Sequence, residues 1–437
     1  MLRLILYKEL REIIGSAKFA VTFGICSLLI ILAFFTGIEN YKTGMEEYNA
    51  SEAAQLRTHE KKTDWREVRN HQVYLTPKPL AALVMGVSND LGRTAYITGS
   101  SIPPLDDSIY SQQPVFAVFR FLDLEFVFQV ILSLFAILFA FDAINGEKER
   151  GTLRLSFANS LPRASYILGK LTGSFLALAL PLLIPILIGV LLLPLSGVAL
   201  STEEWARLGL FILCGLLYLG VFLTLSVFIS CLTQRSSSSF LFLLVIWVCS
   251  VLIIPRASVL IAGNMIDVPS MEEVSVQRLQ LQRQNSREYI QKLNDLYRDF
   301  FQQMSQNRDN SREATDRGFK KISDTLDKIR AENDKSVKDL TSRLNEERRN
   351  IQIKQEKLAF GISRISPTAV FTLAATTFSG TSLELREHFR ERAAAYSDSF
   401  AEFYRKNRLQ YWRHGCDKIE TGRRRETTEA HKHQGNP

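Results

Sequence analysis

The residues most suggestive of chemistry lie in one charged segment between two apolar runs. It reads Asn145-Gly-Glu-Lys-Glu-Arg-Gly-Thr-Leu-Arg-Leu-Ser-Phe-Ala-Asn-Ser-Leu-Pro-Arg163, and Leu168-Gly-Lys170 follows it. Glu147 and Glu149 are two residues apart, so they do not share one face of a helix as a catalytic carboxylate pair would. We interpret them as contacts with different partners. The alternative is a solvated loop whose acids only offset the neighbouring lysine and arginine.

Other catalytic motifs are absent from the sequence. A phosphate-binding loop needs an upstream glycine and a final hydroxyl, and Gly169-Lys170-Leu171 has neither. No Gly-x-Ser-x-Gly elbow and no His-Glu-x-x-His helix is present. Four residues of the tail could be metal ligands, but their spacing matches no ligand pattern: His414, Cys416, His431 and His433. We therefore predict no catalytic residue, no cofactor and no metal site in this chain.

The elements that position the charged segment are long apolar runs. Hydrophobic residues make up 46% and charged residues 22%, which would suit a soluble protein, but their distribution does not. Residues 171–202 and 208–234 contain no charge, and roughly 20 apolar residues suffice to cross a membrane. A soluble fold is excluded. We predict an all-α membrane protein with about five transmembrane helices: 19–38, 124–143, 168–195, 208–232 and 239–261.

The N-terminal residues 1–18 predict an amphipathic helix that lies in the surface of the lipid bilayer. Its apolar positions repeat at helical spacing, and its other side carries charges that include Lys8, Glu9 and Arg11. Lysine and arginine are concentrated before the first span, in the loop 144–165 and at Arg235. These segments share one side if five spans alternate, so the positive-inside rule predicts a cytoplasmic N-terminus.

The remaining segments are then expected outside the cytoplasm. Residues 39–120 form a smaller insert between the first two spans. Residues 263–364 predict a helical hairpin, because apolar positions in two stretches alternate spacings of three and four, as in a coiled coil. The pattern breaks at 307–312 and at Gly318; a single long solvated helix is the alternative. We expect outer helices over 365–411 and a disordered tail over 412–437.

The charged segment resembles the coupling segment of ABC-2-type exporter permeases. That family carries a Glu-x-Glu-x-Gly-Thr-Leu pattern between the second and third spans, then a proline and a Gly-Lys pair. The resemblance implies a coupling helix that docks into a separate ATPase subunit. The matching positions here are Glu147, Glu149, Gly151, Thr152, Leu153, Leu155, Phe157, Pro162, Arg163, Gly169 and Lys170.

The two outer inserts are similar to those of a subgroup with large extracytoplasmic domains, such as the membrane subunits of nitrous-oxide-reductase maturation and gliding-motility exporters. The family usually has a sixth span, and no run after Ser366 is apolar enough to supply it. The resemblance implies a multi-pass protein of the inner (plasma) membrane that is a transporter subunit and no enzyme. ATP and Mg would be bound by the partner ATPase.

The expected partners are that ATPase, a second permease copy or a homologous permease, the lipid bilayer and an extracytoplasmic protein. Nucleic acid is not expected, because the net charge of +8 is spread among interleaved acids and bases. The competing hypothesis is a membrane-anchored scaffold or sensor whose outer coiled coil binds a partner without transport.

Overall fold

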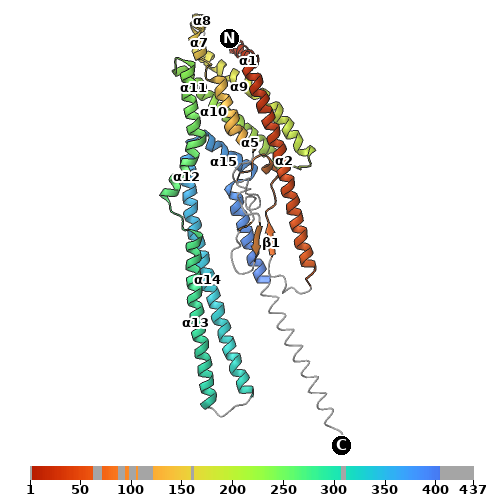
Figure 1. Ribbon diagram of the computed structural model, residues 1–437, viewed down its shortest axis with the longest axis vertical. Coiled ribbons are helices and arrows are strands. Elements are labelled where there is room, and N and C mark those ends of the chain that lie inside the picture. The colour runs from red at the N-terminus through yellow and green to blue at the C-terminus, as the bar shows by residue number, and fades with distance from the viewer. Residues whose placement is uncertain are drawn as a thin grey trace. The chain divides into compact units, whose positions relative to one another are not determined.

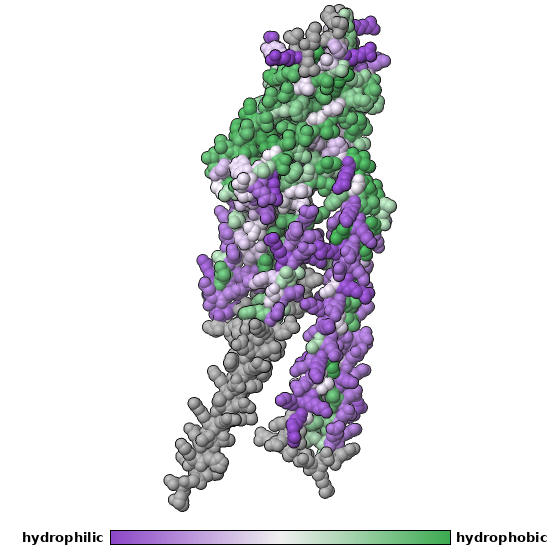
Figure 2. Space-filling model, turned by 180° about the vertical axis from the view of Figure 1, so that it is seen from behind, coloured by the Kyte–Doolittle hydropathy of each residue, from purple (hydrophilic) through white to green (hydrophobic). Residues whose placement is uncertain are grey.

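The computed structural model describes residues 2–62, 71–86, 94–97, 105–106, 122–158, 162–306 and 312–403 of the 437-residue chain (Figure 1). The chain divides into two compact units, Met1–Leu252 with Ser366–Pro437, and Ile253–Ile365. Among the described residues, five helical stretches are long and apolar enough to cross a membrane: Ala17–Glu60, Leu124–Glu149, Arg163–Leu195, Thr202–Leu232 and Ser236–Met265. Each of the five predicted spans falls within one of them. Figure 2 shows the hydrophobic residues gathered in a broad region of the surface.

The N-terminal part forms two helices, α1 (Leu2–Ile14) and α2 (Ala17–Glu60). Ser16 separates them as the N-cap of α2, and its Oγ accepts a hydrogen bond from the Phe19 amide at 3.1 Å. The helix α2 continues well beyond residue 38, where the predicted first span ended. Residues 39–60 lack proline and contain one glycine, so helix propensity carries α2 onward after the apolar run has ended.

The second span is divided into α5 (Leu124–Phe126), the π-helical segment η3 (Val127–Leu132) and α6 (Ser133–Ala140). Two short helices follow, α7 (Asn145–Glu149) and α8 (Thr152–Ala158). The helix α9 (Arg163–Leu195) begins earlier than the predicted third span. Pro162 precedes it in an extended conformation, and the helix starts directly after this proline instead of at residue 168.

The fourth and fifth spans are α10 (Thr202–Leu232) and the continuous stretch of α11 (Ser236–Val248), η4 (Cys249–Ile253) and α12 (Ile254–Met265). The helix α15 (Pro367–Ser379) packs on α10, where the rings of Phe371 and Tyr218 stack at 4.7 Å. Phe371 and Ala375 belong to the main hydrophobic core, so this part of the predicted outer region is packed among the spans. A helical segment over 383–403 follows; residues 404–411 and the predicted tail lie outside the described residues.

A small antiparallel sheet was not predicted and departs from the all-α fold class. Its strands are β1 (His71–Tyr74), β2 (Thr94–Ile97) and β3 (Leu105–Asp106), in the order β1-β2-β3. Ala95 and Ile97 of β2 pack against Phe389 and Ala393 of the segment 383–403. The strands are too short to show a clear alternation of polar and apolar residues, which is why the sequence did not reveal them.

The second unit contains the helical hairpin of α13 (Met271–Gln306) and α14 (Arg312–Ser363). The two helices run antiparallel, since Asn285 Nδ2 donates to Ser336 Oγ at 3.1 Å and the rings of Phe300 and Phe319 lie 5.0 Å apart. Gly318 lies inside α14 and does not break it. The Phe300 ring occupies the space beside this glycine, which explains why a side chain is absent there. Residues 307–311 lie outside the described residues.

Candidate functional site

The charged segment identified in the sequence lies at the ends of several span helices. Three consecutive charged residues of α7 each contact a different part of the bundle. Lys148 binds the end of α10, Glu149 binds the start of α11, and Glu147 binds α9 and α1. The helix α7 has only five residues, so these side-chain contacts, more than its own backbone bonds, fix its place.

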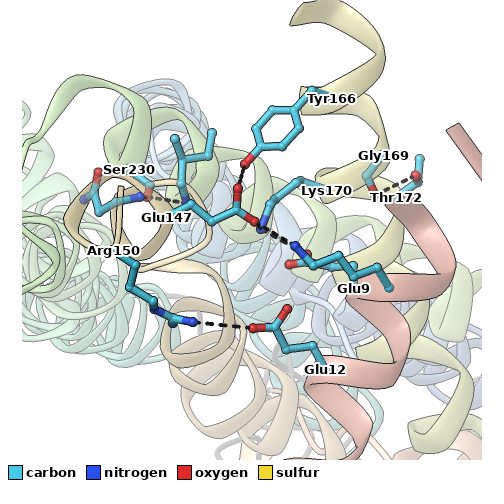
Figure 3. Close-up of polar contacts among 12 residues, drawn as sticks. Glu9, Glu12, Glu147, Arg150, Tyr166, Gly169, Lys170, Thr172 and Ser230 are labelled. Atoms are coloured by element: carbon cyan, nitrogen blue, oxygen red, sulfur yellow. Dashed lines mark hydrogen bonds and ion pairs between the residues drawn. The ribbon is translucent and has the colours of Figure 1, made fainter. Parts of the chain in front are cut away.

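Lys148 satisfies the C-terminal carbonyls of α10. Its Nζ donates to the carbonyl oxygens of Ser230, Cys231 and Thr233 at 3.3, 2.6 and 3.1 Å. The last carbonyls of a helix lack partners within the helix, and the helix dipole favours a cation there. Ser230 strengthens the junction from the other side, because its Oγ accepts from the amides of Ile144 and Asn145, both at 3.1 Å (Figure 3).

Glu149 binds the N-terminal end of a helix, whereas Lys148 binds a C-terminal end. Its carboxylate accepts hydrogen bonds from the Ser236 amide at 2.8 Å and from the Ser236 hydroxyl at 3.2 Å. Ser236 is the first residue of α11, where free amides and the helix dipole favour an anion. The sequence interpretation placed Glu149 as a contact to another molecule; in the structure its carboxylate binds the start of the fifth span.

Glu147 belongs to a buried ion-pair cluster, which we call the buried triad: Glu9, Glu147 and Lys170. Lys170 Nζ lies 3.0 Å from a carboxylate oxygen of Glu9 and 3.0 Å from one of Glu147, and its side chain is only 6% exposed. Tyr166, one helical turn before Lys170, donates its hydroxyl to Glu147 at 2.6 Å. Figure 3 shows Glu147 of α7, Tyr166 and Lys170 of α9, and Glu9 of α1 pointing toward one another. Glu147 thus binds inside the chain, unlike the partner contact expected from the sequence.

Close packing of α1 on α9 makes the triad possible. A side chain at Gly169 would begin 2.8 Å from Ile5 Cγ2, and one at Gly173 would begin 2.8 Å from Glu9 Cβ. The two glycines are four residues apart and therefore lie on one face of α9. Their lack of side chains lets α1 approach closely enough for Glu9 to reach Lys170, so Glu9 is buried instead of lying on the exposed polar side of α1 as expected.

Burial raises the pKa of the Glu9 carboxyl above its ordinary value, and this effect outweighs the attraction of Lys170. The neighbouring acids Glu12 and Glu147 act in the same direction. The folded chain therefore holds this proton to higher pH than the unfolded chain does. It follows that the contribution of Glu9 to stability falls as pH rises from the ordinary carboxyl value through the raised one.

The helix α8 carries the other residues of the predicted coupling segment. Gly151 has φ +74°, a conformation that favours glycine, and it joins α7 to α8. Leu153 and Phe157 are half-buried against the core, and the Phe157 ring lies 5.4 Å from that of Tyr166. The exposed residues on α8, at the start of α9 and on the neighbouring α1 are Thr152, Arg154, Pro162, Arg163, Lys8 and Arg11. The side chain of Leu155 lies outside the described part.

Sequence reasoning missed several residues of this site, including Tyr166, Lys148 and Ser230. Two signals were present: Lys170 is a lone charge at the start of an apolar run, and Gly169 and Gly173 have the spacing of a close helix contact. Among the described residues no group of three histidine, cysteine or acidic residues is arranged to hold a metal ion. The site links helices through charge and hydrogen bonds, and its exposed face lies on α8 and α1.

These features define a multi-pass membrane protein in which the short helix α7 is tied to the ends of the spans. The sequence model described as ABC-2 family transporter protein matches residues 3–384, and the chain belongs to this family. The chain is also similar to the probable ABC transporter permease protein NosY of Stutzerimonas stutzeri, with 37% identity over 125 residues. That match covers 28% of this chain and 45% of the relative, less than half of the relative's length.

Proposed function

We propose that the chain is the permease subunit of an ATP-binding-cassette exporter and that α8 docks into a separate ATPase subunit. Family membership and the similarity to a probable permease support a membrane subunit of such a transporter. ATP and Mg would bind the ATPase, and two permeases, identical or homologous, would pair in the membrane. The N-terminus and α8 would face the cytoplasm, with the hairpin outside.

The observation that carries this proposal is the set of contacts made by residues 147–149. A docking element drives transport only if its displacement reaches the spans. Glu147, Lys148 and Glu149 connect α7 to α9, α10 and α11, and the buried triad adds α1. A push on α8 therefore reaches four helices at once through short, charge-assisted bonds. A bystander loop would need no such contacts.

The docking face is the exposed side of α8 with its neighbours on α9 and α1. Arg154, Arg163 and Arg11 are exposed cations in this region, and they would pair with acidic residues of the ATPase. The half-buried side, with Leu153 and Phe157, holds α8 against the bundle. The charged contacts to the partner would set its register, while the apolar side transmits the load.

The test separates docking from transmission. Arg154→Glu should weaken binding of the ATPase subunit in a pull-down or titration, because it reverses charge on the docking face. Glu149→Lys should retain binding and membrane insertion but lose the ATP turnover that the permease stimulates in reconstituted vesicles, because it places a cation at the start of α11. Glu203→Lys is the matched control, since Glu203 lies in the first turn of α10 at the other end of a span.

Unchanged binding with Arg154→Glu together with unchanged turnover with Glu149→Lys would favour a scaffold or sensor. The observation that favours a scaffold is the hairpin, because its helices of 36 and 52 residues offer a large surface to a partner. A scaffold would bind that partner equally well whether or not the ATPase is present.

A further inference from the structure

A groove runs between α9 and α10 on the surface of the span bundle. Its volume is about 770 Å³, which is within the range of small-molecule binding sites. Apolar side chains line most of it, including Leu171, Phe175, Leu217, Val221 and Phe228. Gly220 contributes no side chain, and the Phe175 ring lies beside it. Leu217, Val221 and Phe228 remain 62, 46 and 56% exposed in this chain.

The groove offers nothing to a polar ligand. Its two hydroxyls belong to Thr172 and Thr224, and each donates to a carbonyl of its own helix: Thr172 to Leu168 at 2.6 Å and Thr224 to Gly220 at 2.7 Å. The lining contains no charged residue. An occupant with hydrogen-bonding groups would lose its water without gaining partners, so the groove selects hydrocarbon.

The length and the position of the groove match one leaflet of a bilayer. The lining residues of α10 run from Leu217 to Phe228, which is about 16 Å at 1.5 Å per residue. Half of a hydrocarbon core about 30 Å thick is roughly 15 Å. Phe228 lies one turn before the end of α10 at Leu232, so one end of the groove reaches the headgroup level on the side of α7.

Positive charge lies at that end of the groove. Arg163 is the first residue of α9 and Arg235 follows the end of α10, and both are exposed. Neither helix has an acidic residue between its groove lining and this end. Cations near the membrane surface attract the headgroups of anionic lipids. The apolar groove therefore complements an acyl chain, and the cationic end complements the anionic headgroup of the same lipid molecule.

We propose that this groove holds an acyl chain of an anionic phospholipid, whose headgroup binds Arg163 and Arg235. The lipid fills the hollow above Gly220 and covers the exposed side chains of α9 and α10. This site shares Arg163 with the proposed docking face, but its occupancy by lipid does not depend on the proposed transport function. The competing occupant is a second copy of the chain, which would exclude lipid from the groove.

Fluorescence quenching by brominated lipids tests the proposal on the full chain in vesicles. Phe228→Trp places a reporter in the groove, and Phe242→Trp is the matched control, because Phe242 is an exposed ring of α11 near the same end of the bundle. Quenching is measured relative to the parent chain with brominated phosphatidylglycerol or brominated phosphatidylcholine of the same chain length. The phosphatidylglycerol should be preferred at Phe228→Trp, by about fivefold for each arginine that binds it, and not at Phe242→Trp.

Two further variants identify the contacts. Arg163→Gln with Arg235→Gln should abolish the preference for the anionic lipid while quenching persists. Gly220→Leu should fill the groove and also abolish the preference; the added Cβ would lie 3.5 Å from Phe175, an ordinary contact distance. Equal quenching by both lipids at Phe228→Trp would show ordinary boundary lipid only and overturn the proposal. Absence of quenching by either lipid would also overturn it and show that protein covers the groove.

Discussion

At the scale of single residues, the buried triad is the feature with the largest energetic consequence. The side chains of Lys170, Glu9 and Glu147 are only 6, 8 and 11% exposed. Lys170 is the cation that both carboxylates share, and Lys8 is a second cation 3.4 Å from Glu147. A buried ion pair gives little net stability compared with an apolar packing, but removing one partner leaves an uncompensated charge. The triad therefore fixes where α1 lies on α9 more than it stabilises the fold as a whole.

Lys170→Met should lower the stability of the chain markedly. It leaves Glu9 and Glu147 buried without their shared cation, a loss of about 3–5 kcal/mol. The measurement is the midpoint of thermal unfolding in detergent. Lys42→Met is the matched control, because Lys42 is exposed on α2 and its removal should change stability by less than about 0.5 kcal/mol. Adding Glu9→Gln and Glu147→Gln to Lys170→Met should restore much of the loss; equal midpoints for Lys170→Met and the parent would show that the triad is not formed.

At the scale of elements, the hairpin is the clearest case in which spacing in the sequence predicts packing. Ile322 and Leu326 lie on the predicted apolar positions of α14, and both are buried. One turn after Leu326 on α14, Arg330 lies over the Tyr289 ring of the facing helix α13 at 5.1 Å. The antiparallel arrangement follows from the two apolar stretches, each of which needs the other to cover it.

Leu326→Asp should unfold the hairpin locally. Removing a buried leucine costs about 2–5 kcal/mol, and the new carboxylate adds the cost of an unpaired buried charge. Limited proteolysis of the full chain should then cut within α13 and α14 sooner, with a loss of helical circular dichroism. Lys328→Asp changes an exposed residue of the same turn and should leave both unchanged. A Leu326→Asp chain as resistant as its parent would contradict the packed hairpin.

Sequence patterns predicted the spans and the hairpin because local apolar periodicity determines them. They did not predict the buried triad, because Glu9, Glu147 and Lys170 are far apart in the chain and only the packing of α1 on α9 brings them together. Glu149 was interpreted as a contact with a partner, whereas its carboxylate binds the start of α11. Charge types could be read from the sequence, whereas their partners depend on tertiary structure.

At the scale of the whole molecule, the alternation of five spans fixes which segments share a side of the membrane. The contacts of α7 with the end of α10 and the start of α11 place these three elements at one end of the bundle. The basic residues before α2, around α7 and at Arg235 lie on this side, so the positive-inside rule predicts that it is cytoplasmic. If all five helices cross, the same rule predicts the outer end of α2 and the hairpin on the opposite side.

Labelling with a membrane-impermeant thiol reagent checks this topology in intact cells, using a chain whose native cysteines are replaced. Ser237→Cys, on the exposed side of the first turn of α11, should react only after the cells are opened. Glu52→Cys on α2 and Ser286→Cys on α13 are both exposed and should react from outside. Reaction at Ser237→Cys alone would invert the orientation and with it the side on which an ATPase can dock. Reaction at Glu52→Cys without Ser286→Cys would instead mean that one of the last four apolar helices does not cross, because these two positions are separated by an even number of spans.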